Sequence, residues 1–186
     1  MWVSRRPRPV VDAAQGEGHM AGTDTRHAPS TPASLVGLAV FVAAVTATAL
    51  VGALANTGSS SEYAALQQPS WAPPSWVFGP VWTFLYALIA VSGWLVWRLG
   101  GWRGARTELT VFAVQLLLNA VWSPLFFGAG LRGLAFVDIC LLAVALVATI
   151  VLFARRSRLA AALLVPYLAW VLFAGALNFA VWQLNA

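Results

Sequence analysis

Polar and aromatic side chains recur at helical spacing in three apolar stretches of this sequence. They are Phe78, Trp82, Tyr86 and Ile89 in one stretch, Gln115, Asn119, Trp122, Ser123 and Phe126 in the next, and Pro166, Trp170, Ala174, Asn178, Trp182 and Asn185 in the last. Residues three or four apart share one face of a helix. Aromatic walls with a few amides and hydroxyls suit a flat, largely apolar ligand that is held by stacking and one or two polar contacts.

The same residues also fit a purely structural interpretation. Amides at membrane depth turn inward to find partners, so Gln115 and Asn178 could each serve only as hydrogen bonds between helices. The chain has 10 Trp residues, and an aromatic belt at the headgroup level accounts for many of them. The belt explains five of these residues well, namely Trp71, Trp76, Trp94, Trp97 and Trp102. It explains Trp82, Trp122 and Trp170 less well, because they fall within the apolar stretches.

Asp138 is the one acidic residue well inside an apolar stretch. A carboxylate at membrane depth is costly and is a candidate functional group. It also follows the expected start of a helix near Arg132, where a helix N-terminus favours an anion. Structural anchoring and a role in ligand or proton handling both remain open. Pro124 should break a backbone hydrogen bond and kink its helix, which would widen the bundle there or leave only a kink.

No common catalytic constellation is present. His19 and His27 both precede the first apolar stretch, no Ser has a partner His, and no phosphate-binding glycine loop occurs. The single cysteine, Cys140, lies in an apolar run and excludes an intramolecular disulfide or a cysteine-rich metal site. The sequence therefore predicts no catalytic residues, no metal site and no obligatory cofactor, and it argues against a hydrolase or a metalloenzyme.

The elements that must position these side chains are five transmembrane helices. The chain is 60% hydrophobic and 9% charged, whereas soluble domains are nearer to 25% charged. The apolar stretches span about residues 35–55, 79–99, 107–127, 133–154 and 159–184, the last possibly straight only from Pro166. About 20 residues cross a bilayer core, and five consecutive helices that are apolar all round would leave no surface for water. We predict an all-α integral membrane bundle over residues 34–186.

Two segments lie outside these helices. Residues 1–33 contain Arg, Gly and Pro but no long apolar run, so we expect a disordered cytoplasmic tail in which Met20 is an alternative start. The connection Asn56–Phe78 contains Pro69, Pro73 and Pro74, and because proline fixes φ and lacks an N–H donor, we expect a structured, non-helical interfacial segment.

The orientation follows from arginine, which supplies all 11 basic residues. Ten of them fall in the tail and in the second and fourth connections, and Arg132 alone falls on the other side. Without the tail the ratio is still six to one. The positive-inside rule then places the N-terminus in the cytoplasm and the long first connection and the C-terminus outside, in a bacterial inner or plasma membrane. The net charge of +5 reflects this topology and predicts no nucleic-acid partner.

Four blocks of the sequence resemble the TspO/MBR family of tryptophan-rich sensory and translocator proteins. Trp71–Tyr86, WAPPSWVFGPVWTFLY, is similar to the family's WxPP…F…VWxxLY signature, and Gln115–Gly128, QLLLNAVWSPLFFG, is similar to its third helix. Asp138 falls at the family's fourth-helix aspartate. The ending from Pro166-Tyr167-Leu168-Ala169-Trp170 to Asn185 resembles the family's last helix. The resemblance covers residues 35–186.

The resemblance implies a five-helix bundle, often a homodimer, with a pocket open towards the first connection. It implies that the ligand is a tetrapyrrole such as a porphyrin or haem, and sterols also bind in the family. The implied ligand-binding residues are Tyr63, Trp71, Trp82, Tyr86, Asn119, Trp122, Ser123, Trp170, Ala174 and Asn178. Residues with a structural or ligand-linked role are Pro73, Pro74, Gln115 and Asp138.

The chain departs from the family in one respect. The sterol pattern of animal members needs a basic residue after a tyrosine near the C-terminus, and Tyr167 has none after it; that pattern is weak in any protein. A tetrapyrrole is therefore favoured over a sterol. Three functions remain open: a porphyrin transporter, sensor or stress regulator, a light- and oxygen-dependent porphyrin-degrading enzyme, and a scaffold without a small ligand. The small residues of the first helix allow close helix pairing for a scaffold or dimer.

Overall fold

The computed structural model describes residues 31–55 and 63–186, and this part of the chain is helical without strands. Its elements are α1 (Thr31–Ala55), η1 (Ser75–Val77), α3 (Phe78–Gly104), α4 (Arg106–Ser123), η2 (Pro124–Gly128), α5 (Arg132–Ala154) and α6 (Arg158–Leu184). Within the described residues, five helices are long and apolar enough to cross a membrane. The expected all-α membrane bundle is confirmed.

The limits of two helices, α1 and α3, differ from the expected ones. α1 begins at Thr31, so residues 31–33 belong to the helix and not to the tail. Pro32 is accepted there because the first turn of a helix needs no N–H from it. α3 continues to Gly104 through a kink at Gly101, which has φ +60°, a value that favours glycine. α6 runs continuously through Pro166. Residues 1–30 lie outside the described part.

The connection after α1 is more helical than expected. Residues 63–65 form one helical turn, and Ser75–Val77 form the 3₁₀ turn η1 directly before α3. The prolines prevent a long helix, but a single turn fits between them and Pro74 lies just before η1, where a missing N–H costs nothing. The segment from Asn56 to Glu62 lies outside the described residues.

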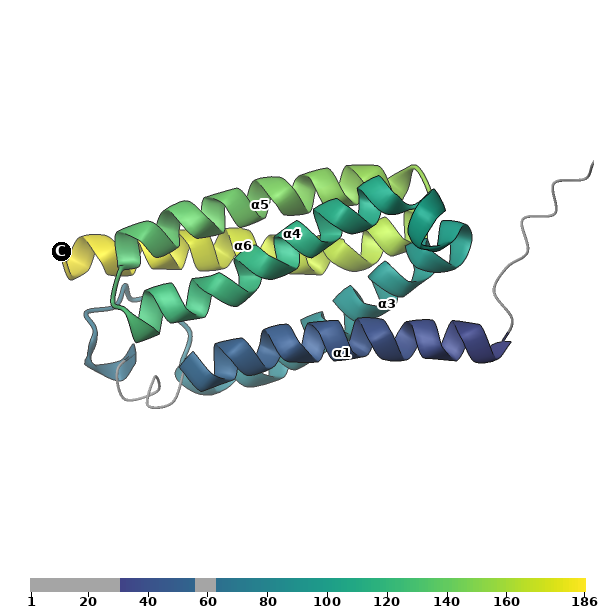
Figure 1. Ribbon diagram of the computed structural model, residues 1–186. Helices are drawn as coiled ribbons and strands as arrows, with labels where there is room; N and C mark the ends of the chain where they lie inside the picture. Colours follow the sequence, from purple (N-terminus) through teal and green to yellow (C-terminus); the bar gives the residue numbers. More distant parts are fainter. Residues whose placement is uncertain (1–30, 56–62) are drawn as a thin grey trace, which may run out of the picture.

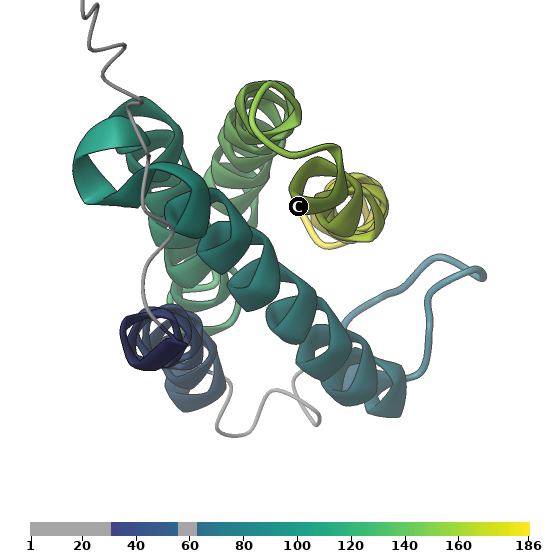
Figure 2. The ribbon, with the colours of Figure 1, turned by 90° about the vertical axis from the view of Figure 1, so that its right-hand side faces the viewer.

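The five long helices run alternately in opposite directions (Figure 1). The connection 63–77, the turn between η2 and α5, and the C-terminus lie at one end, which we call the loop end. The start of α1 and the turns after α3 and α5 lie at the other, which we call the arginine end. An end-on view shows α3 crossing the bundle obliquely, with α1 on one side and α6 on the other (Figure 2).

The arginine end is closely packed. A Cβ atom on Gly93 would lie 2.7 Å from the Phe41 ring of α1 and 2.9 Å from the Phe112 ring of α4. Phe112 stacks on Phe153 with ring centroids 5.7 Å apart. The Arg156 guanidinium also pairs with the Glu108 carboxylate at 2.7 Å and donates to the Gly104 carbonyl. These contacts fix one half of the bundle around a dense core.

The loop end is held by polar contacts across the sequence. The backbone N–H of Gln67 donates to Asn185 Oδ1 at 3.0 Å, and Asn185 Nδ2 donates back to the Gln67 carbonyl at 2.9 Å. The Trp71 ring packs edge-on against Phe173 of α6, with centroids 5.8 Å apart. The connection is therefore tied to the end of α6.

α4 passes into the π-helical turn η2 at Pro124. Pro124 has no N–H to continue the α-helical bonds, and the next bond joins Ala129 N–H to the Pro124 carbonyl at 2.8 Å, five residues apart. The expected disruption at Pro124 takes this form. The wider turn changes the direction in which Phe126 and Phe127 point.

Candidate functional site: an aromatic cavity at the loop end

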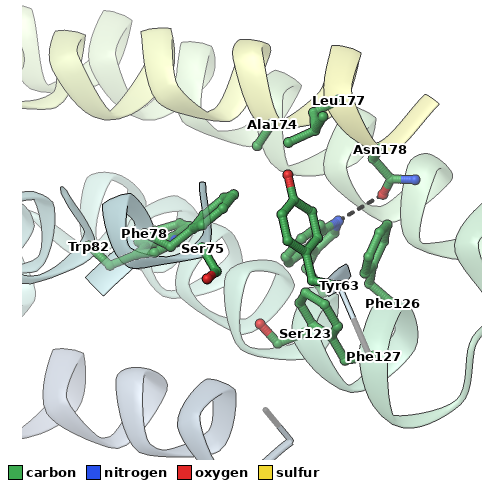
Figure 3. A pocket seen from close by; sticks show the side chains of 11 residues that line it. Tyr63, Ser75, Phe78, Trp82, Ser123, Phe126, Phe127, Ala174, Leu177 and Asn178 are labelled. Atoms are coloured by element: carbon green, nitrogen blue, oxygen red, sulfur yellow. Dashed lines mark hydrogen bonds between the residues drawn. The ribbon is translucent and has the colours of Figure 1, made fainter. Parts of the chain in front are cut away.

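A cavity of about 150 Å³ lies between α3, α4, η2 and α6 at the loop end. Its residues are mostly aromatic or small, with one amide and three hydroxyl groups (Figure 3). They are Tyr63, Ser75, Phe78, Trp82, Trp122, Ser123, Phe126, Phe127, Ala174, Leu177 and Asn178. The connection supplies Tyr63 and Ser75, so it forms one wall of the cavity.

Two further hollows adjoin this cavity. One of about 280 Å³ lies between α1, α3 and α4, and a smaller one of about 30 Å³ lies between α3, α4, α5 and α6. Phe78, Trp82 and Trp122 line all three spaces. These three aromatic side chains therefore lie at the boundaries between the spaces.

The aromatic walls are ordered by ring contacts. Trp82 stacks on Tyr86 and Trp122 stacks on Phe126, each pair with centroids 5.1 Å apart. Phe78 makes edge contacts with Tyr63 at 5.5 Å and with Trp170 at 5.8 Å. Offset and edge contacts of this kind are favourable beyond the area that they bury. They hold the rings in place around the cavity.

The amides both line the hollows and join the helices. Trp122 Nε1 donates to Asn178 Oδ1 at 3.0 Å, and Asn178 Nδ2 donates to the Arg132 carbonyl at 2.9 Å. Tyr86 likewise donates its hydroxyl to Asn119 Oδ1 at 3.0 Å. Asn178 therefore joins helices, as the structural interpretation expected, because its side chain connects α4, α5 and α6. The same side chain also faces the cavity.

Tyr63 is the one tyrosine outside the membrane-spanning helices. Its ring is buried, and its hydroxyl donates to the Pro73 carbonyl at 3.3 Å. Burial raises the pKa of the Tyr63 phenol above its ordinary value, because desolvation disfavours the charged phenolate. The wall that the connection contributes is therefore neutral at physiological pH.

Nine of the ten expected ligand-binding residues line one of these spaces. Six line the main cavity, namely Tyr63, Trp82, Trp122, Ser123, Ala174 and Asn178. Tyr86 and Asn119 line the hollow beside α1, and Trp170 lines the smallest one. Trp71 lines none of the three spaces; it is 50% exposed and lies on Phe173.

The residues expected to be structural or ligand-linked lie around the cavity. Pro73 accepts the Tyr63 hydroxyl, and Pro74 precedes η1. Gln115 and Asp138 are buried in α4 and α5 but line none of the three spaces described above. Asp138 lies in the second turn of α5, so its position near a helix start agrees with the sequence.

Five residues that line the main cavity were not among the expected ligand-binding residues. They are Ser75, Phe78, Phe126, Phe127 and Leu177. Helical spacing had already placed Phe78 and Phe126 on the polar and aromatic faces of their helices. For these two residues the sequence therefore contained a signal that they line the cavity. Phe127 reaches the cavity through the π-helical turn, for which Pro124 is the only local indication. Ser75 lies in a connection where no periodicity exists to predict its direction.

Residues 39–183 match the model of the TspO/MBR family. The chain is 49% identical to the translocator protein of Homo sapiens over 125 residues, which cover 66% of this chain and 74% of that protein. It is 42% identical to the tryptophan-rich protein TspO of Archaeoglobus fulgidus over 154 residues, 82% of this chain and 99% of that protein. It is 38% identical to protein CrtK of Rhodobacter capsulatus over 157 residues, 82% of this chain and 94% of that protein.

Proposed function

The chain belongs to the TspO/MBR family, and we propose that it binds a tetrapyrrole, a porphyrin or haem, in the aromatic cavity within the membrane. The protein is an integral membrane protein of five helices. In this proposal it acts in the transport, sensing or stress regulation of that ligand. The ligand is bound reversibly and is not a resident cofactor.

The observation that supports the proposal is the set of three tryptophans around linked hollows. Trp82, Trp122 and Trp170 come from three different helices, and all three line the smallest hollow. Flat rings stack on such walls, and a few amides suffice to orient them. Ligand pockets usually measure about 300–1,000 Å³, so a ring as broad as a tetrapyrrole would occupy the cavity of about 150 Å³ together with both hollows, which measure about 280 Å³ and about 30 Å³.

Fluorescence titration tests the binding. Protoporphyrin IX should quench the tryptophan emission of the purified protein saturably, and Trp170→Phe should weaken the affinity. Trp102→Phe is the matched control, because Trp102 is exposed at the arginine end and lines none of the three described spaces. Quenching that does not saturate, or equal affinities for both variants, would contradict the proposal.

The same sample decides whether the ligand is also degraded. Three indole rings beside a bound porphyrin are potential electron donors, so illumination in the presence of O₂ is a necessary second arm. An enzyme would cause loss of the porphyrin Soret band only with folded protein, light and O₂. An unchanged rate in the Trp82→Phe/Trp170→Phe double variant would count against an enzyme that uses these tryptophans as electron donors.

Two further parts of the proposal concern partners. We propose a homodimer that uses the outer face of α1, where Ala39, Ala43 and Ala47 are exposed at a spacing of four and would let a second helix approach closely. A sterol remains the secondary ligand. Cross-linking in membranes and competition of a sterol with protoporphyrin IX test these two points separately.

A further inference from the structure

The arginine end carries more positive charge than its own acidic residues can balance. Six arginines lie there, namely Arg98, Arg103, Arg106, Arg155, Arg156 and Arg158. Among the described residues, Glu108 is the only carboxylate at this end, and Arg156 pairs with it at 2.7 Å. The other five arginines are exposed and form no ion pair within the described part of the chain. They leave an excess of positive charge on this face.

The rest of the chain cannot neutralise this excess. Residues 1–30 contain four arginines and only three acidic residues, Asp12, Glu17 and Asp24, so they add positive charge however they are placed. The two remaining acidic residues belong to the loop end, because Glu62 directly precedes Tyr63 in the connection and Asp138 lies in the second turn of α5. The negative charge that balances the arginine end therefore comes from outside the chain.

The fold gathers four of these arginines on one surface. Arg156 Nη2 donates to the Gly104 carbonyl at 2.7 Å and Arg156 Nε donates to the Glu108 carboxylate, so the turn after α5 is fastened to the turn after α3. The positive-inside rule needs arginines on one side of a membrane, but it does not need two turns joined in this way. The exposed arginines within two residues of this link form what we call the arginine surface: Arg103, Arg106, Arg155 and Arg158.

Tryptophans at the same end indicate how deep this surface lies in the membrane. The Trp94 indole N–H donates to the Ser34 carbonyl at 2.9 Å, and the Arg98 guanidinium lies over the Trp94 ring, 4.6 Å from its centroid. Trp102 is exposed and directly precedes Arg103. Tryptophan rings are enriched at the level of the lipid headgroups. The arginine surface therefore lies where the phosphates of the adjoining leaflet lie.

We propose that the arginine surface binds an anionic phospholipid of the leaflet at that end. A guanidinium group can donate two parallel N–H bonds to phosphate oxygens, and clusters of basic residues beside a membrane-spanning helix favour anionic headgroups. A zwitterionic lipid also offers a phosphate, but its ammonium group brings a positive charge towards the arginines. The surface and the aromatic cavity lie at opposite ends of the bundle, so the proposal does not rest on tetrapyrrole binding.

Native mass spectrometry tests the lipid preference. The full chain is released from nanodiscs that contain an equimolar mixture of phosphatidylglycerol and phosphatidylcholine, and the lipids that stay bound are counted. The wild type should retain phosphatidylglycerol over phosphatidylcholine by about fivefold, the factor that one arginine near an anionic headgroup typically supplies. Equal retention of the two lipids by the wild type would overturn the proposal.

Two variants with the same change of charge locate the site. The first replaces every arginine of the arginine surface by glutamine (Arg103→Gln/Arg106→Gln/Arg155→Gln/Arg158→Gln), and it should lose the preference for phosphatidylglycerol. The matched control removes four positive charges from residues 1–30 (Arg5→Gln/Arg6→Gln/Arg8→Gln/Arg26→Gln), and it should keep the preference. An equal loss in both variants would show that the net charge of the chain attracts the lipid, and that result would overturn the proposal.

A milder variant covers the case in which the fourfold change prevents folding. Arg103→Gln/Arg155→Gln removes one exposed arginine from each turn and leaves the pair of Arg156 and Glu108 intact. It should at least halve the preference for phosphatidylglycerol, and an unchanged preference would overturn the proposal. Binding of a polyglutamate peptide to the protein in detergent, without any preference for phosphatidylglycerol, would assign the surface to an acidic protein partner and would also overturn it.

Discussion

Asn178 shows how a single side chain can serve both the scaffold and the cavity. Its amide accepts from Trp122 and donates to the Arg132 carbonyl, and it also lines the cavity. Spacing alone could place Asn178 on the inner face of its helix. It could not identify the partners, because they lie 46 and 56 residues away in the chain and depend on how α5 and α4 pack against α6.

We predict that Asn178→Leu destabilises the protein. The variant has the same branching and the same number of side-chain heavy atoms, but it loses both hydrogen bonds and leaves the Trp122 indole N–H without its partner, at a cost of about 1–3 kcal/mol. Thermal unfolding in detergent measures the loss. Phe179→Leu is a control, since Phe179 is exposed on the same helix. An Asn178→Leu variant as stable as the control would show that these bonds contribute nothing.

At the scale of the element, the sequence predicts the helices better than their packing. Apolar stretches located all five spans to within a few residues, because length and composition alone decide whether a helix can cross a bilayer. Phe127 was not predicted as a lining residue, because the π-helical turn shifts the helical register before it. Ser75 was not predicted either, because it lies in a connection, where no helical register exists. The hollows themselves depend on the crossing of α3 past α1, which no single segment encodes.

We predict that Pro124→Ala lowers ligand affinity without lowering stability. The alanine variant regains an N–H, so α4 can continue as an α-helix where the π-helical turn now begins. An α-helical turn has one residue fewer per hydrogen-bonded turn than a π-helical turn, so the change would rotate Phe126 and Phe127 by about 100° away from the cavity. Titration with protoporphyrin IX and thermal unfolding of the same sample check both parts. Unchanged affinity would mean that the turn does not position these rings.

We predict that Gly93→Ala weakens the packing of α1 on α3. The added Cβ would lie 2.7 Å from Phe41 and 2.9 Å from Phe112, both buried rings that have little room to move, and overpacking of this kind costs about 1–3 kcal/mol. Gly79→Ala is the matched control on the same helix, because among the described residues nothing lies within 4 Å of its Cβ position. Thermal unfolding should show a loss for the first variant only. Equal Tm values would show that the two rings can shift at no cost.

At the scale of the whole molecule, the charges and the cavity lie at opposite ends. Arg98, Arg103, Arg106, Arg155, Arg156 and Arg158 lie at the arginine end, whereas Arg132 and the cavity wall formed by the connection lie at the loop end. The sequence could predict this polarity, because the predicted helix limits decide at which end of the bundle each arginine lies. It could not predict that the connection is tied to α6 through Gln67 and Asn185, which are 118 residues apart.

The polarity leads to a prediction about orientation. The positive-inside rule predicts that the arginine end faces the cytoplasm and that the cavity lies towards the extracytoplasmic side. In a Cys140→Ser background, Ala129→Cys at the loop end should react with a membrane-impermeant maleimide on spheroplasts, and Arg103→Cys should react only after lysis. Both positions are exposed in the structure, so a difference in labelling reports the side of the membrane and not burial. The reverse pattern would place the cavity towards the cytoplasm, and the ligand would then have to come from that compartment or from the inner leaflet.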